Sequence, residues 1–113
     1  MTTQSIPSEH LEQVRLVSWF RRKYPAIRIF AVPNGGVRSA SAGASLKAEG
    51  VTPGVPDLHV PEWQLWIEMK RTEGGTVSPA QKDWVIYLQG ISHKVIVGRG
   101  FEDAKAKILA WQE

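Results

Sequence analysis

Aliphatic residues and methionine occupy every second position near the middle of the chain, between Gln64 and Lys70. This period of two is typical of a β-strand, whose successive side chains point to opposite faces. The apolar face consists of Leu65, Ile67 and Met69, and the opposite face of Trp66, Glu68 and Lys70. A second short strand is predicted over Asp57–Val60, and Pro61-Glu62 lies between the two as a turn. The pattern therefore predicts two adjacent strands with one apolar face.

The N-terminal part of the chain carries a helical pattern. Ser8 is a good N-cap, and Glu9 stands in the first turn, where the helix dipole favours a negative charge. The spacing of apolar residues predicts a buried face formed by Leu11, Val14, Val17 and Phe20. Tyr24-Pro25 is expected to end this helix, because the residue before a proline disfavours helical backbone.

Five further elements complete the predicted order. Ser78-Pro79-Ala80-Gln81 forms a capping box with proline at the first helical position, so a helix is expected from there to about Gln89. The Ala- and Ser-rich residues 39–49, followed by Gly50, predict a short helix. The remaining predicted elements are strands over Ile27–Val32 and Lys94–Val97 and an amphipathic helix over Phe101–Trp111. The order α-β-α-β-β-α-β-α predicts an α/β fold with a mixed sheet flanked by helices.

Composition narrows the class of protein. With 113 residues the chain is expected to form one domain, residues 1–113, with a flexible start over residues 1–7. No apolar run is long enough for a membrane span, no secretory signal is recognisable, and cysteine is absent, which together favour a cytoplasmic protein. The net charge of +3 is weak support for an acidic partner, and the run Arg21–Lys23 by itself fits a solvated face.

The candidate chemistry lies in Pro56-Asp57 and Glu68-Met69-Lys70. If the two strands are hairpin neighbours, both carboxylates and the ammonium group meet at one end of the sheet. Two carboxylates suit Mg²⁺ or Mn²⁺, and the carbonyl of Met69 could add a third ligand. Lys70 could orient a water molecule or stabilise a pentacoordinate phosphate, so the set fits phosphodiester hydrolysis. The spacing alone is loose, since Glu-x-Lys is also common on solvated strands.

Together with its surroundings, this constellation resembles the PD-(D/E)xK nuclease motif, and within it the VRR-Nuc family. The similarity runs from about Ser8 to Gly98. The segments that carry it are residues 8–13, Pro33-Asn34-Gly35-Gly36 with Arg38, residues 50–58, Glu68-Met69-Lys70 and residues 78–84. The resemblance implies a restriction-endonuclease-like fold and DNA cleavage that depends on Mg²⁺ or Mn²⁺. Stand-alone members of this size are similar to Holliday junction resolvases and act as dimers.

The resemblance also implies roles for particular residues. Asp57 and Glu68 would be metal ligands, Lys70 the catalytic lysine, and Gln81 a helix residue pointing into the site. Gln81 could instead complete the capping box with Ser78. Glu9 would be the acid of the first helix, with Glu12 as the alternative.

A glycine-rich loop and its neighbours are the expected DNA contacts, although spacing alone fits an ordinary turn. These residues are Asn34, Gly35, Gly36, Arg38 and Lys47. His59, two residues after Asp57, could line the site or be a packed or surface histidine.

The sequence thus favours a divalent-metal-dependent DNA endonuclease, acting as a homodimer on branched, flapped or Holliday-junction-like DNA. Two alternatives stay open at this point. One is a nucleic-acid-binding module without catalysis on the same fold. The other is a protein-interaction domain whose tryptophans form the interface.

Overall fold

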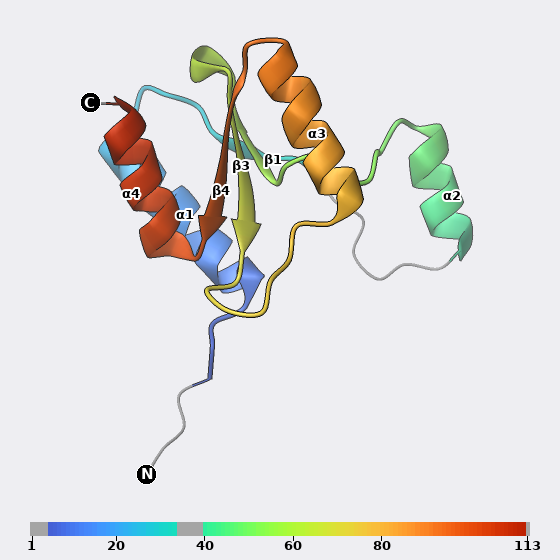
Figure 1. Cartoon of the computed structure of the whole chain (residues 1–113), viewed down its shortest axis with the longest axis horizontal. Coiled ribbons are helices and arrows are strands. Elements are labelled where there is room, and N and C mark those ends of the chain that lie inside the picture. Colours follow the sequence, from blue (N-terminus) through green and yellow to red (C-terminus); the bar gives the residue numbers. More distant parts are fainter. Residues whose placement is uncertain (1–4, 34–39, 113) are drawn as a thin grey trace.

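The computed structural model describes residues 5–33 and 40–112. Its helices and strands follow the predicted order (Figure 1). The elements are α1 (Glu9–Lys23), β1 (Phe30–Ala31), α2 (Ala40–Ala48), β2 (Leu58–Val60), the 3-10 turn η1 (Pro61–Trp63), β3 (Leu65–Lys70), α3 (Pro79–Gly90), β4 (Lys94–Arg99) and α4 (Phe101–Gln112).

The strands form one mixed sheet in the order β1-β2-β3-β4. β1 and β2 are antiparallel, as are β2 and β3, whereas β3 and β4 run parallel. A parallel pair needs a crossover connection, and α3 supplies it between β3 and β4. The predicted mixed α/β fold is therefore confirmed, including the hairpin of β2 and β3.

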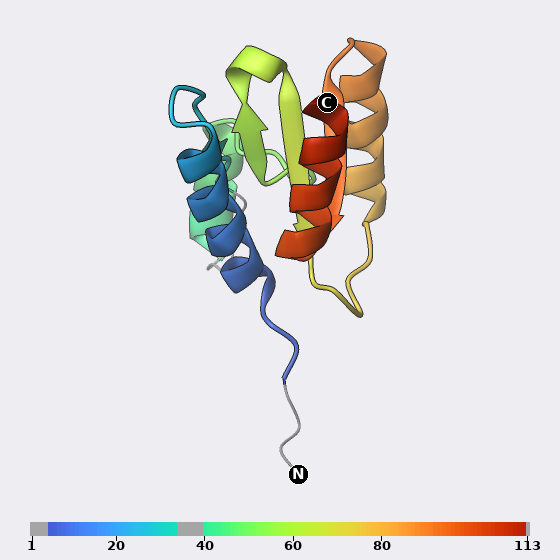
Figure 2. The same cartoon turned by 90° about the vertical axis from the view of Figure 1, so that its left-hand side faces the viewer.

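The sheet has one apolar face and one partly polar face. Leu65, Ile67 and Met69 are fully buried in the core, as their alternation along β3 predicts. α1 and α4 cover this apolar face, while α3 lies on the other side of the sheet (Figures 1 and 2). Glu68 and Lys70 thus point away from α1 and α4, towards the side that α3 occupies.

The buried face of α1 differs from the predicted one. Phe20 is buried as expected, but Leu11 is 39% and Val14 49% exposed. The residues buried with Phe20 are Leu16 and Glu12, which follow the same helical row at steps of four. The prediction was wrong for Leu11 and Val14, because a row that includes a carboxylate does not stand out as apolar in the sequence, whereas Val17 does pack against the core.

The ends of α1 and the length of β1 show how local chemistry sets the elements. Ser8 Oγ accepts a hydrogen bond from the Leu11 N–H at 3.1 Å, so the predicted N-cap is confirmed. Tyr24 is the C-cap, also as predicted. β1 is only two residues long instead of Ile27–Val32, because only Phe30 and Ala31 pair with β2. The segment before β1 packs instead through Ile27 and Ile29 against the core.

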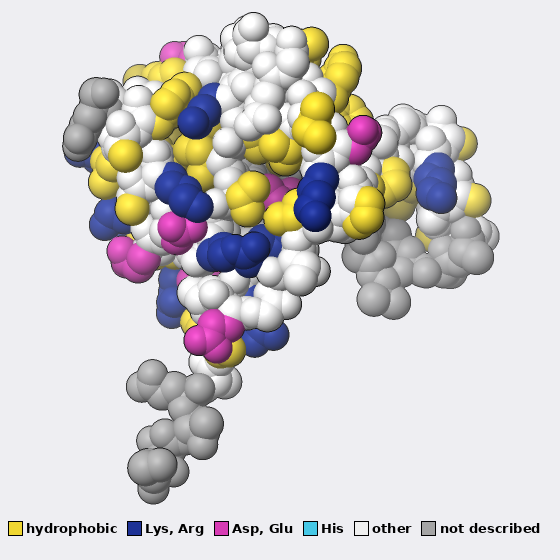
Figure 3. Space-filling model, in the orientation of Figure 1, with side chains coloured by type: hydrophobic (Ala, Val, Ile, Leu, Met, Phe, Trp, Pro, Cys, Tyr) yellow, Lys and Arg dark blue, Asp and Glu magenta, His cyan; other side chains and the backbone are white. Residues whose placement is uncertain are grey.

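α2 projects from the main body as a lobe of its own (Figures 1 and 3). It is built from Ala, Ser and Gly with Leu46 as its large apolar residue. The backbone N–H of Val51 donates to the carbonyl of Leu46 at 2.9 Å and ends the helix. Small side chains offer little area to bury, which explains why this helix stands apart from the core.

The edge of the sheet formed by β4 is partly covered. Lys107 of α4 donates from Nζ to the carbonyl of Val97 at 2.7 Å. The same ammonium group pairs with Asp103 at 3.0 Å. A charged side chain therefore lies across a backbone acceptor that another strand would otherwise use. In the described residues, no helix is long and apolar enough to cross a membrane.

Candidate active site

Asp57 and Glu68 face each other across the β2–β3 hairpin. The ladder pairs Leu58 with Ile67, so one further step of the antiparallel register brings Asp57 opposite Glu68. Side chains directly opposite one another lie on the same face of a sheet. Two backbone N–H groups hold Asp57: its carbonyl accepts from Val32 N–H at 2.8 Å, and its side-chain Oδ2 accepts from Met69 N–H at 2.7 Å.

The Glu68 carboxyl group is almost completely buried, with 1% of the residue exposed. Burial and the neighbouring carboxylate of Asp57 raise its pKa from 4.5 to about 8, although Lys70 acts in the opposite direction. Its Oε2 atom is buried and has no hydrogen-bond partner in the described part of the chain. Such an acid takes up a proton or a cation to satisfy its buried oxygen.

Lys70 lies next to Glu68 with its ammonium group buried. Nζ is 3.6 Å from Glu68 Oε1 and donates to Gln81 Oε1 at 2.9 Å. The residue is 6% exposed, so this charge is held in a site from which water is largely excluded. A buried cation in a fixed position can stabilise negative charge much more strongly than a solvated one.

The Gln81 side chain belongs both to the helix cap and to the candidate site. Its Oε1 accepts from the backbone N–H of Ser78 at 2.8 Å and completes the capping box of α3. The same oxygen accepts from Lys70, and Nε2 donates to Glu68 Oε1 at 2.7 Å. The same amide therefore completes the cap and contacts both Lys70 and Glu68, and the cap fixes its orientation.

Gly54 brings the loop before Asp57 against the start of α3. Its φ is +91°, and a Cβ atom there would lie 2.6 Å from the backbone carbonyl carbon of Ala80. Only glycine permits both this conformation and this close approach. Because Ala80 precedes Gln81, the contact holds the Asp57 strand and the Gln81 helix together. Sequence reasoning identified Gly54 only as part of the family resemblance and gave it no role.

Arg99 contacts the loop after β3, and this loop packs on Lys70. Arg99 is paired with Lys70 in the parallel register of β3 and β4, so both side chains start from the same face. Its Nη1 donates to the carbonyl of Gly75 at 2.6 Å. A Cβ on Gly75 would lie 3.3 Å from the Cβ of Lys70, so this loop packs on the lysine stem. The sequence assigned no role to Arg99, and its register with Lys70 places it beside the candidate site.

The two acids of α1 lie in different surroundings. Glu9 is exposed in the first turn, whereas Glu12 is buried with 4% exposed. Glu12 Oε2 would be 2.6 Å from a Cβ on Gly100, whose N–H donates to the Lys70 carbonyl at 2.8 Å. Glu12 therefore lies against the ends of β3 and β4, and its ion-pair partner is Arg15 at 3.7 Å.

The other predicted site residues are distributed as follows. Asn34, Gly35, Gly36 and Arg38 lie outside the described residues. Lys47 is exposed on α2. Met69 has a fully buried side chain, and its N–H contacts Asp57. His59 is a packed histidine: it stacks on Trp66 at 3.9 Å between ring centroids, and its Nδ1 is 3.0 Å from the Leu65 carbonyl.

Comparison with known proteins shows which solved structure this architecture resembles. No family model matches the sequence, and no curated protein sequence matches it. A solved structure described as a "VRR_NUC domain protein" matches with a TM-score of 0.79. The match has 23% sequence identity and covers 95% of this chain and 89% of that one. The chain has the fold of a VRR_NUC domain.

Within this VRR_NUC fold, the described acids offer two carboxylates to a cation. No group of three His, Cys, Asp or Glu side chains in residues 5–33 and 40–112 is arranged to hold a metal ion. The oxygens of Asp57 and Glu68 are nevertheless the hard ligands that Mg²⁺ and Mn²⁺ prefer. Mg²⁺ usually keeps several waters and takes one or two carboxylates, so the donor set and the unsatisfied Glu68 Oε2 fit such an ion.

Proposed function

We propose that this chain is a VRR-Nuc endonuclease that hydrolyses phosphodiester bonds in DNA with the help of Mg²⁺ or Mn²⁺. The observation that carries the proposal is the pair of opposed carboxylates, Asp57 and Glu68, with the buried ammonium group of Lys70 3.6 Å from Glu68. The shared fold with a VRR_NUC domain protein supports it.

Asp57 and Glu68 are the proposed metal ligands, and the backbone carbonyl of Met69 is a proposed third ligand. The ion supplies a Lewis acid that polarises a phosphate oxygen and makes a water molecule easier to deprotonate. With such an ion bound, Glu68 would be held as a carboxylate, because the cation would satisfy its buried oxygens in place of a proton.

Lys70 acts on the reacting phosphate in this proposal. Its ammonium group is held by Gln81 and Glu68, so it stays aimed at one point while charge develops on the phosphoryl oxygens. Gln81 keeps this lysine and Glu68 at a fixed separation through its two amide atoms. Fixed donors of this kind need no reorganisation during the reaction.

Of the two acids on α1, we propose Glu12 as the one that supports the site. It is buried against Gly100 at the end of β4, beside the Lys70 backbone, whereas Glu9 is exposed. In this position Glu12 would support the site indirectly, through its contact with the backbone at the ends of β3 and β4.

The preferred DNA is proposed to be branched or flapped, including Holliday junctions, and the enzyme a homodimer. A body of 45 × 40 × 25 Å offers one site and little surface for a four-way junction. Two copies related by a two-fold axis would present two sites to two strands. Sedimentation analysis tests the dimer, and a single monomeric species at assay concentrations would contradict it.

The direct test of the activity is cleavage of labelled linear duplex, flap and four-way-junction DNA with Mg²⁺, with Mn²⁺ and with EDTA. We expect metal-dependent products for the wild type and a loss in Asp57→Asn and Lys70→Ala. Lys105→Ala, on α4, is the matched control for the removal of one lysine. No product on any DNA would contradict the proposal, and salt-sensitive binding without cleavage would favour a binding module.

A thermal shift separates metal binding from catalysis. An ion that binds the folded state stabilises it by about 2.7 kcal/mol at 100 times its Kd. We expect Mn²⁺ to raise the melting temperature of the wild type and of Lys70→Ala, but not of Asp57→Asn. An equal shift in all three proteins would remove Asp57 from the proposed ligand set.

A further inference from the structure

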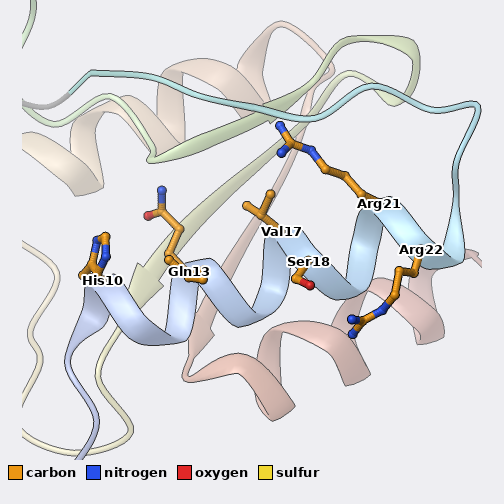
Figure 4. A pocket seen from close by; sticks show the side chains of 7 residues that line it. His10, Gln13, Val17, Ser18, Arg21 and Arg22 are labelled. Atoms are coloured by element: carbon orange, nitrogen blue, oxygen red, sulfur yellow. The ribbon is translucent and has the colours of Figure 1, made fainter.

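The outer side of α1 carries a shallow groove that the candidate active site does not use. It has a volume of about 580 Å³ and is lined by residues of α1 between His10 and Arg22, among them Gln13, Val17 and Arg21. We call this surface the α1 groove. Figure 4 shows His10, Gln13, Val17 and Arg21 projecting from one side of the helix, with Ser18 and Arg22 along its flank.

The α1 groove lies largely on the side of the helix that the core leaves free, and of its lining residues Val17 also packs against the core. The buried row of α1 consists of Glu12, Leu16 and Phe20. The groove residues stand on the same turns but on the other sides of the helix. Val14 in the groove is 49% exposed, and both arginines are exposed. The groove is thus an accessible surface of three helical turns.

Its chemistry is that of an anion-binding surface. None of the side chains that line it in the described part of the chain is acidic, whereas two are arginines and one is a histidine. Arg21 Nη2 donates to the Ile29 carbonyl at 3.3 Å, which holds this guanidinium beside the segment leading to β1. A guanidinium held in this way loses less freedom when its other N–H groups bind phosphate oxygens.

The groove starts at the end of the molecule where the candidate site lies. Arg71, the residue after Lys70, donates from Nη2 to the carbonyl of Ile6 at 3.3 Å, just before α1 begins. From His10 to Arg21 the helix rises by about 16 Å. Phosphates of one strand follow each other at about 3.4 Å along a duplex axis, so the groove spans about five of them.

We propose that the α1 groove binds the phosphate backbone of the DNA whose strand is cut at Lys70. This inference rests on the proposed nuclease function and adds a substrate contact surface to it. The cations at Arg21 and Arg22 would take up phosphates on one side of the scissile bond, away from the reacting centre. Such contacts give affinity and position without reading the base sequence.

A second copy of the chain fits the groove less well. Two α1 helices packed antiparallel about Val14 and Val17 would bring Arg21 of one copy towards His10 of the other. This arrangement offers Arg21 no acidic partner and leaves two valines as the apolar contact. A stable protein interface buries at least about 1,200 Å² with an apolar centre, which two valines on a single helix do not supply.

The test measures DNA binding without cleavage. Binding of a fluorescent flap DNA is followed by anisotropy in EDTA across a range of NaCl concentrations, for wild type and Arg21→Gln/Arg22→Gln. Loss of two phosphate contacts is expected to reduce the slope of log K against log salt by about 1.8. Lys94→Ala/Lys105→Ala removes two charges from β4 and α4 and is the matched control. Arg21→Lys/Arg22→Lys keeps the charges and should retain most of the slope.

The outcomes separate this inference from the proposed function. An unchanged slope in the Gln variant, or the same reduction in the control, overturns the inference. A Gln variant that binds DNA normally but changes the oligomeric state assigns the groove to a second copy and also overturns it. A reduced slope confined to the Gln variant supports the groove even if the wild type cuts no DNA. If the wild type cleaves DNA and the Gln variant keeps the wild-type slope, the proposed nuclease function stands and the proposed role of the groove does not.

Discussion

The amide of Gln81 donates from Nε2 to Glu68 at 2.7 Å, while its oxygen caps the helix on which Gln81 itself stands. A single side chain thus connects the start of α3 to the buried carboxyl of the site. Because the cap fixes which amide atom faces which partner, Lys70 always meets the oxygen and Glu68 the nitrogen.

Gln81→Ala should therefore affect both stability and catalysis. Lys70 and Glu68 each lose a hydrogen-bond partner in a buried site, which costs about 1–3 kcal/mol of unfolding free energy. Misplacement of the ammonium group should reduce the cleavage rate by about 100-fold. Urea unfolding and single-turnover cleavage measure the two effects.

Ser78→Ala is the matched control for this change. It removes the Ser78 Oγ that accepts from the Gln81 N–H at 3.2 Å, but leaves the Gln81 amide in place. We expect a loss of about 1 kcal/mol in stability and a much smaller effect on cleavage. Equal losses of activity in both variants would show that the helix start, and not the amide, supports the site.

The raised pKa of Glu68 predicts how stability changes with pH when no metal is present. The unfolded chain releases this proton near pH 4.5, whereas the folded chain keeps it up to about pH 8. Between these values the folded state binds more protons, so its stability falls as the pH rises. The slope from this group is at most about 1.4 kcal/mol per pH unit, and it ends above pH 8.

Glu68→Gln should remove this component, because an amide does not titrate. Urea unfolding in EDTA at several pH values between 4.5 and 8 measures the difference between the two proteins. Glu62→Gln, an exposed position in η1, is the control. If wild type and Glu68→Gln lose stability in parallel over this interval, the carboxyl group is not held in its protonated form.

Gly54→Ala should disrupt the contact between the Asp57 loop and α3. The new Cβ would overlap the Ala80 backbone, and a φ of +91° is unfavourable for alanine. We expect a loss of about 1–3 kcal/mol in unfolding free energy and a lower cleavage rate.

Gly50→Ala separates the two causes. Gly50 also has a positive φ, of +102°, but a Cβ there meets nothing within 4 Å. This variant should show only the conformational cost of about 1–2 kcal/mol and keep its activity. Activity that is equally reduced at both positions would contradict a specific role for the Gly54 contact.

Substitutions of the two acids of α1 form a further pair of variants. Glu12→Gln should reduce cleavage by about 10- to 100-fold, as expected for a group that supports a metal site. Glu9→Gln, at an exposed position of the same helix turn, should leave the rate close to that of the wild type. A loss in Glu9→Gln with normal Glu12→Gln would reverse the assignment.

Much of the fold could be predicted because the relevant signals are local. The alternation along β3 separates Ile67 in the core from Glu68 in the site, and the capping box locates the start of α3. The turn between β2 and β3 is short enough to make them neighbours. These features depend on residues close to one another in the chain, so the sequence displays them directly.

The remaining features depend on contacts between distant residues. The rotation of α1 buries Glu12 in place of Leu11, and no periodicity of apolar residues reveals a carboxylate in the buried row. Two contacts join segments far apart in sequence: Gly54 packs against Ala80, and Arg99 donates a hydrogen bond to Gly75. Such pairings follow from how the layers pack, and composition carries no trace of them.

The ammonium group of Lys107 on the Val97 carbonyl limits how copies of this protein can meet. An approaching strand would have to displace a cation and would gain no acceptor at that position. Sheets of neighbouring molecules therefore cannot easily merge into one continuous ribbon at this margin, which favours a chain that remains dispersed at high concentration. Two molecules that pair would therefore meet through a part of the surface other than the β4 edge.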